Sequence, residues 1–142
     1  MIARFVLDAS VALSWILPDD SVEQRAYAAA VLRQVEREQP QLAVPSVFSV
    51  EVVSVMLRAC RLRAISQEHL DRGLSMLERL PIQIHRQTCG LDEMRSLGRH
   101  YNLQPHDALY VELARELAVP IAAFDARVRT ACRTFGVDLV ET

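Results

Sequence analysis

Short runs of β-branched and aliphatic residues alternate with longer stretches of helical periodicity along the whole chain. The runs that we expect to form strands are residues 5–7, 42–44, 82–85, 121–124 and 137–140. The expected helices span about residues 11–17, 22–38, 46–62, 67–80, 88–100, 105–117 and 126–135. Strands that are separated by helices pair in parallel through helical crossovers. The pattern therefore predicts a three-layer α/β/α sandwich with a mainly parallel central sheet.

Local signals mark several of the expected helix boundaries. Ser21 and Gln24 have the spacing of a capping box, and Ser66 stands where an N-cap belongs. Pro18 ends the first short helix, and Pro45 stands where the helix after the second strand begins. In sheets of this kind the chemistry collects at the carboxyl ends of the strands, so these boundaries indicate where to look for a site.

The composition favours one ordinary globular domain over residues 1–142. Hydrophobic residues make up 51% of the chain and charged residues 24%, which excludes a disordered polypeptide. The formal net charge of -2 provides no overall field that would attract nucleic acid. All 16 basic residues are Arg, and this excludes every mechanism that needs a lysine ammonium group.

The cysteines and the hydropathy pattern indicate a cytoplasmic protein. Cys60, Cys89 and Cys132 are odd in number and lack CxxC spacing, so we expect reduced thiols rather than disulfides or a zinc site. Asp8 interrupts the apolar run at the N-terminus, unlike the core of a signal peptide. No uncharged stretch approaches the roughly 20 residues that a membrane span needs, so no membrane partner is expected.

Two carboxylates stand in unusual surroundings. Asp8 ends the first expected strand, where it could either cap the next helix or belong to a site. Glu51 is the only charge in the run VFSVEVVSVML, on a helix that is otherwise apolar. A carboxylate in such surroundings costs several kcal/mol unless a distant Arg or a bound cation compensates it. The position of Glu51 therefore favours a functional role.

Two further acids sit at the starts of helices. Asp107 lies in the first turn of PHDALYVELA, and Asp125 follows the expected strand IAAF. Each could simply stabilise a helix N-terminus. Together with Asp8 and Glu51, however, they form a group of carboxylates at the edge where α/β sites form, and such a group repels itself unless a cation lies between its members. Oxygen-only ligation suits Mg²⁺ or Mn²⁺, whereas the four His residues lack zinc-ligand spacing.

At these residues the sequence resembles the PIN-domain nucleases, and most closely the VapC-type toxins of bacterial toxin–antitoxin pairs. The resemblance covers nearly the whole chain, in the expected order and spacing. It rests on the stretches VLDASVALSWILPDD, VPSVFSVEVVSVML, LGRHYNLQPHDALYVELA and IAAFDARVRTAC.

The resemblance implies a PIN-like fold and an Mg²⁺- or Mn²⁺-dependent endoribonuclease. The family's four acids correspond to Asp8, Glu51, Asp107 and Asp125, and its small hydroxyl residue corresponds to Ser10. It also implies an RNA substrate, a small antitoxin partner that holds the toxin inactive, and a homodimer.

This sequence departs from the family pattern at three positions. Ser54 stands where many relatives carry Asn, and Ala123 stands where many carry Thr or Ser two residues before the last acid. Either change could weaken the support of the metal ligands. His106 stands where Tyr is common, which we interpret as neutral. None of the three departures removes an acid.

The predicted mechanism assigns a role to each site residue. Asp8, Asp107 and Asp125 hold the metal directly or through water, Glu51 positions water or a second ion, and Ser10 supports them. We expect products with a 5′-phosphate and a 3′-hydroxyl. Two arginine clusters could contact phosphates or form ordinary solvated helix faces, and the sequence leaves both open. They comprise Arg58, Arg61 and Arg63, and Arg127, Arg129 and Arg133.

Other classes of protein fit less well. Receiver domains and haloacid-dehalogenase-type phosphatases need a Lys that this chain lacks, and the four glycines form no P-loop or dinucleotide motif. The remaining rival is a catalytically weak or inactive scaffold of the same fold that binds an antitoxin or RNA. DNA as the substrate is a further alternative within the nuclease class.

Overall fold

The computed structural model describes residues 1–18 and 20–142. Its strands are β1 (Arg4–Leu7), β2 (Gln41–Pro45), β3 (Ile82–His85) and β4 (Ile121–Ala122). Its helices are α1 (Ala9–Ser14), α2 (Val22–Glu38), α3 (Val47–Arg61), α4 (Gln67–Glu78), α5 (Leu91–Tyr101), α6 (Pro105–Leu117) and α7 (Ala126–Phe135).

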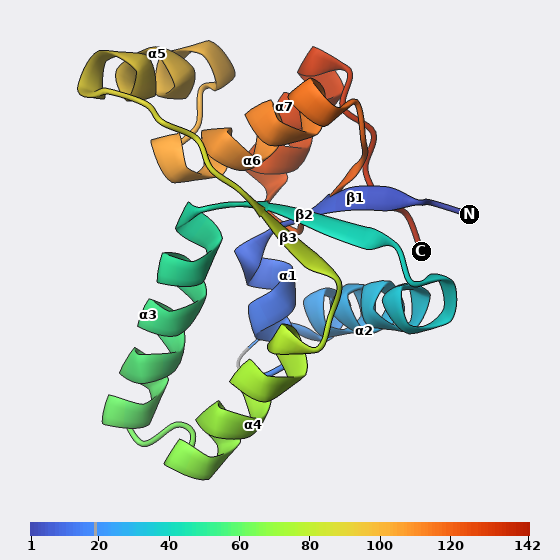
Figure 1. The fold of residues 1–142 in the computed structure, drawn as a ribbon, viewed down its shortest axis with the longest axis vertical. Helices are drawn as coiled ribbons and strands as arrows, with labels where there is room; N and C mark the ends of the chain where they lie inside the picture. Colours follow the sequence, from blue (N-terminus) through green and yellow to red (C-terminus); the bar gives the residue numbers. More distant parts are fainter. Residues whose placement is uncertain (19) are drawn as a thin grey trace.

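The four strands form one sheet in the order β3-β2-β1-β4, and every pairing is parallel. The register places Val6 of β1 opposite Ala43 of β2 on one side and opposite Ile121 of β4 on the other. Figure 1 shows the helices α5, α6 and α7 on one side of the sheet and α1 to α4 on the other. The predicted parallel α/β/α sandwich is therefore confirmed.

The core fills both faces of the sheet. Phe5, Leu7 and Leu42 from the strands are completely buried, and so are Met56 of α3 and Tyr110 of α6. Burial of this kind is worth roughly 1.5–3 kcal/mol for each large apolar side chain. The central strand β1 is therefore held from both layers, which fixes the position of the residues that follow it.

Local chemistry sets the helix ends. The Ser21 hydroxyl accepts a bond from the Gln24 backbone N–H at 3.2 Å, and the Gln24 side chain accepts one from the Ser21 N–H at 3.3 Å, so the predicted capping box is confirmed. Ser66 caps α4 by accepting from the His69 N–H at 3.0 Å. Helix α7 ends at Gly136, whose φ of 73° lies in the left-handed region that glycine tolerates best.

The structure corrects four boundaries. The expected strand 137–140 is reduced to a single bridge between Leu139 and Ile121, because β4 is only two residues long and offers little edge for pairing. Strand β4 ends before Ala123, whose carbonyl accepts a bond from the Arg129 side chain instead of from a strand. Helix α5 starts at Leu91 rather than near residue 88, and α1 starts at Ala9 because Asp8 caps it.

Among the described residues, no helix has the length and apolar character that crossing a membrane requires.

Candidate active site

The order of the strands creates a switch point beside β1. The chain moves from β1 to β2 and β3 on one side, whereas β4 pairs with the opposite side of β1. Ligands of open α/β sheets bind outside the carboxyl ends of the strands at such a point. Asp8 directly follows β1, and its backbone N–H donates to the carbonyl of Ala122 at the end of β4, at 3.1 Å. The switch point therefore carries an acidic side chain.

Asp8 is the buried charged residue of this edge, with 7% of its surface exposed. Its Oδ2 accepts a hydrogen bond from the Ser10 hydroxyl and another from the Ser10 backbone N–H at 3.3 Å. Both bonds hold the carboxylate at the N-terminus of α1. Capping and a place in the site are thus not alternatives for Asp8, because the structure shows the cap and the burial together.

The environment of Asp8 raises its pKa from 3.8 to about 6, and burial is the largest cause. The two bonds from Ser10 lower the pKa, whereas the nearby carboxylates of Asp107 and Glu51 contribute to the rise. Desolvation and like charge therefore act in the same direction on this group. A positive ligand would relieve both effects.

Glu51 lies half-buried in the second turn of α3. Its Oε1 accepts a hydrogen bond from the Tyr110 hydroxyl of α6 at 2.9 Å. Burial raises its pKa, the bond from Tyr110 and the proximity of His106 lower it, and the charge of Asp107 raises it. Glu51 therefore faces α6 and Asp107 rather than open solvent.

Asp107 lies in the first turn of α6, which begins at Pro105. Its side chain is 29% exposed, and its Oδ1 lies 3.5 Å from Nε2 of His106. Burial raises the pKa of Asp107, His106 lowers it, and Asp125 raises it. Asp107 thus stands between the inner acids and Asp125.

Asp125 is the exposed member of the group. It caps α7, accepting from the backbone N–H groups of Arg127 at 2.8 Å and Val128 at 3.2 Å. Only its Oδ1 is used in these bonds, so the other oxygen has no partner among the described residues. The cap fixes the carboxylate at the rim of the site.

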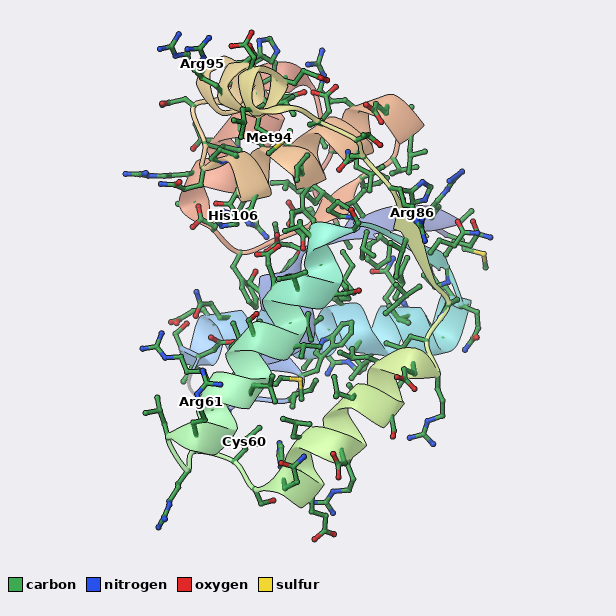
Figure 2. The ribbon with its side chains drawn as sticks, turned by 60° about the vertical axis from the view of Figure 1, so that its left-hand side comes forward. Cys60, Arg61, Arg86, Met94, Arg95 and His106 are labelled. Atoms are coloured by element: carbon green, nitrogen blue, oxygen red, sulfur yellow. The ribbon has the colours of Figure 1, made fainter. Side chains whose placement is uncertain are left out.

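The four predicted acids are therefore brought to one edge of the sheet. Asp8 interacts electrostatically with Glu51 and Asp107, Glu51 interacts with Asp107, and Asp107 interacts with Asp125. Figure 2 shows the neighbouring His106 at the start of α6, close to the beginning of α3. Four segments that are far apart in the sequence thus contribute one acidic side chain each.

The donor set fits a hard divalent cation. It consists of oxygen atoms only, and burial raises the pKa of three of its members, Asp8, Glu51 and Asp107, an effect that a bound cation would oppose. Across residues 1–18 and 20–142, no three acidic, histidine or cysteine side chains are close enough together to hold one metal ion between them. Mg²⁺ commonly keeps several waters and uses only one or two carboxylates directly, so an open arrangement of this kind suits it.

Two of the residues that depart from the family pattern, Ala123 and Ser54, lie in different surroundings. Ala123 is completely buried, and its methyl side chain packs in the core and provides no hydroxyl. Ser54 lies on the exposed face of α3, one turn beyond Glu51. Neither residue makes a side-chain hydrogen bond to the acids among the described residues.

The arginine clusters separate into different environments. Figure 2 shows Arg61 at the far end of α3 from His106. Arg58 lies in the same last turn of α3 and Arg63 follows the helix, so this cluster lies away from the acids. In the second cluster, Arg129 is already engaged: its Nε donates to the Ala123 carbonyl at 2.8 Å, and its guanidinium lies over the Tyr27 ring. Arg127 and Arg133 remain exposed.

Sequence reasoning missed two residues of this edge, His106 and Tyr110. The sequence pattern gives His106 no role in the site, yet its Nε2 lies 3.5 Å from Oδ1 of Asp107. Tyr110 was overlooked because it reads as one more core residue of α6. Its polar atom in the otherwise apolar stretch ALYV was the available signal, since a buried hydroxyl needs a partner.

Comparison with known proteins agrees with this geometry. The model of the PIN domain family matches residues 5–133. The crystal structure of PAE2754 from Pyrobaculum aerophilum is similar, with a TM-score of 0.61 and 18% identity over 91% of this chain and 79% of that one. This likeness shows the fold alone. No curated protein matches the chain. The family match covers most of the chain, which therefore belongs to the PIN domain family, whose members are generally nucleases.

Proposed function

We propose that this protein is an Mg²⁺- or Mn²⁺-dependent endoribonuclease, the toxin component of a type II toxin–antitoxin system. The observation that supports the activity is the group of four acids at the switch point, with Asp8 buried and its pKa raised to about 6. An excess of carboxylates at one edge is destabilising by itself, and it becomes useful when a cation is bound there.

Each residue has a role in the proposed reaction. When bound, a divalent ion would activate water as the nucleophile and neutralise charge on the phosphate. Asp8, Asp107 and Asp125 would hold the ion directly or through water, and Ser10 fixes the orientation of Asp8. Glu51 orients the attacking water or a second ion. In-line attack on phosphorus then leaves a 5′-phosphate and a 3′-hydroxyl.

RNA would enter from the exposed side of Asp125. Arg127 and Arg133 are exposed on α7, directly after this acid, and can neutralise backbone phosphates. The net charge of the chain is -2, so such local positive charge is needed to bring a polyanion to an acidic site. The choice of RNA over DNA rests on the resemblance of the sequence to the toxin branch.

The proposed partners are a small antitoxin and a second copy of the chain, in the cytoplasm. An exposed apolar stripe on α3 supports a protein partner: Val50, Val53 and Leu57 are 65%, 38% and 43% exposed. Apolar surface of this kind on a small domain commonly marks an interaction site.

An inactive scaffold of the same fold is the second candidate. It is favoured by Ala123 and Ser54, which leave the acids without the hydroxyl and amide groups that many relatives carry. Binding of RNA or of an antitoxin fits both candidates, so only cleavage separates them.

The deciding experiment incubates the purified chain with bulk single-stranded RNA in EDTA, Mg²⁺ or Mn²⁺. We expect cleavage with either metal and none in EDTA. Asp8→Asn should abolish it, whereas the control Asp138→Asn, which changes an exposed acid, should retain it. Full cleavage by Asp8→Asn would refute the assignment of the site, and metal binding without cleavage of any RNA would favour the scaffold.

A further inference from the structure

The Tyr110 hydroxyl connects two helices at the carboxyl edge of the sheet. Its ring is completely buried in α6, and its O–H donates to Oε1 of Glu51 in α3 at 2.9 Å. The two residues are 59 positions apart, and their helices belong to opposite layers of the sandwich. The bond therefore joins the layers beside the acids.

The phenol can act here only as a donor toward the carboxylate. Burial raises the pKa of Tyr110 far above its usual value of 10, and the charges of Glu51 and Asp8 raise it further. The hydroxyl thus stays protonated throughout the physiological range. The backbone of Ala9, the residue after Asp8, acts in the opposite direction and lowers the pKa. The charges of Asp8 and Glu51 both act on the Tyr110 hydroxyl, which therefore lies close to the acidic site.

The two partners differ in stiffness. Tyr110 has two side-chain torsions and is packed on all sides, whereas Glu51 has three torsions and lies half-buried. Tyr110 provides the one hydrogen bond to the Glu51 carboxylate among the described residues. Without it, Glu51 would be free to turn away from the neighbouring charge of Asp107.

We propose that Tyr110 is a positioning residue, which fixes Oε1 of Glu51 so that the remaining carboxylate oxygen is held for the metal-dependent site formed with Asp8 and Asp107. The inference rests on the proposed nuclease function, and it assigns to Tyr110 no direct contact with RNA or metal. It predicts that loss of the Tyr110 hydroxyl, which is 59 residues from Glu51 in the chain, affects the site through Glu51 alone.

The test compares Tyr110→Phe with a matched control. Tyr101→Phe also removes a hydroxyl from a buried tyrosine, but Tyr101 bonds to Glu112 and Arg115 on the outer side of α6. Urea unfolding and circular dichroism establish that both variants fold. Single-turnover cleavage of RNA is then measured at saturating Mn²⁺, and the Mn²⁺ affinity is measured by calorimetry. We expect Tyr110→Phe to lower both the Mn²⁺ affinity and the cleavage rate, the rate by about 10- to 100-fold, and Tyr101→Phe to leave both within about twofold.

A double-mutant cycle with Glu51→Ala separates positioning from a general structural role. Because Tyr110 acts through Glu51, Tyr110→Phe should reduce neither the cleavage rate nor the Mn²⁺ affinity further once Glu51 is absent. An equal reduction in both backgrounds, or a Tyr110→Phe enzyme that is indistinguishable from wild type, would overturn the inference.

Failure of the proposed function gives a different result. If the wild-type chain binds Mn²⁺ but cleaves no RNA, the nuclease proposal fails, and the Mn²⁺ arm of the cycle still decides the role of Tyr110. If the wild-type chain neither binds Mn²⁺ nor cleaves, both proposals are overturned.

Discussion

Replacement of Asp8 by Asn should stabilise the metal-free protein at neutral pH. The folded state raises the pKa of Asp8 from 3.8 to about 6, mainly because the carboxylate is buried with 7% of its surface exposed. The folded protein therefore binds this proton more tightly than the unfolded chain does. The contribution of Asp8 to the free energy of unfolding is fully present below about pH 4. It falls as the pH rises from about 4 to about 6, and it is lowest above about pH 6.

The difference between the two pKa values gives the size of this destabilisation. One pH unit between the two pKa values corresponds to about 1.4 kcal/mol, so ionisation of Asp8 destabilises the fold by about 3 kcal/mol at pH 7. Asn has nearly the same shape, remains neutral, and keeps a carbonyl that can accept from Ser10. Its gain over wild type should therefore approach 3 kcal/mol at pH 7 and vanish near pH 4.

Urea unfolding in EDTA measures this difference directly. Wild type, Asp8→Asn and the control Asp138→Asn are compared between pH 4 and pH 7.5, and the control should stay within about 0.5 kcal/mol of wild type throughout. An Asp8→Asn protein that is no more stable than wild type at pH 7 would refute the reasoning. It would mean that the environment of Asp8 stabilises the charged form even without a metal.

Three further outcomes follow from the structure. Mn²⁺ at 100 times its dissociation constant should stabilise wild type by about 2.7 kcal/mol and Asp8→Asn by much less, which differential scanning fluorimetry at several metal concentrations can follow. Ser21→Ala removes the acceptor for the Gln24 N–H and should lower the unfolding free energy by about 1 kcal/mol in urea. Gly136→Ala meets no neighbour within 4 Å but is held at a φ of 73°, so the same measurement should show a loss of about 1 kcal/mol from backbone strain alone.

Much of the fold could be predicted because its signals are local. The capping box at Ser21 and Gln24, the Pro105 start of α6 and the alternation of strands and helices are all encoded within a few residues. The C-terminal strand was wrong for a non-local reason. Leu139 can pair only along the length that β4 offers, and β4 ends at Ala122; the next carbonyl, that of Ala123, accepts a bond from the Arg129 side chain.

Part of the site could likewise be predicted from local signals, and part could not. That Asp8, Glu51, Asp107 and Asp125 gather at one edge could be inferred, because parallel strands end at the same edge and the acids lie near strand or helix ends. The bond between Tyr110 and Glu51 could not, since it depends on how α3 and α6 approach each other from opposite layers. Likewise, the neighbouring sequence does not distinguish Arg129 from the exposed Arg127. Only the fold shows that Arg129 bonds to the Ala123 carbonyl and lies over the Tyr27 ring.

The central claim is that the four acids hydrolyse RNA with a bound metal ion, and the chemistry of the product ends tests it most directly. A 5′-labelled RNA is cleaved by wild type in Mn²⁺, and the new termini are identified by mass spectrometry, with Asp8→Asn and an EDTA reaction alongside. The account predicts 5′-phosphate and 3′-hydroxyl ends that appear only with wild type and metal. Cyclic 2′,3′-phosphate ends, or cleavage that persists in EDTA, would contradict it.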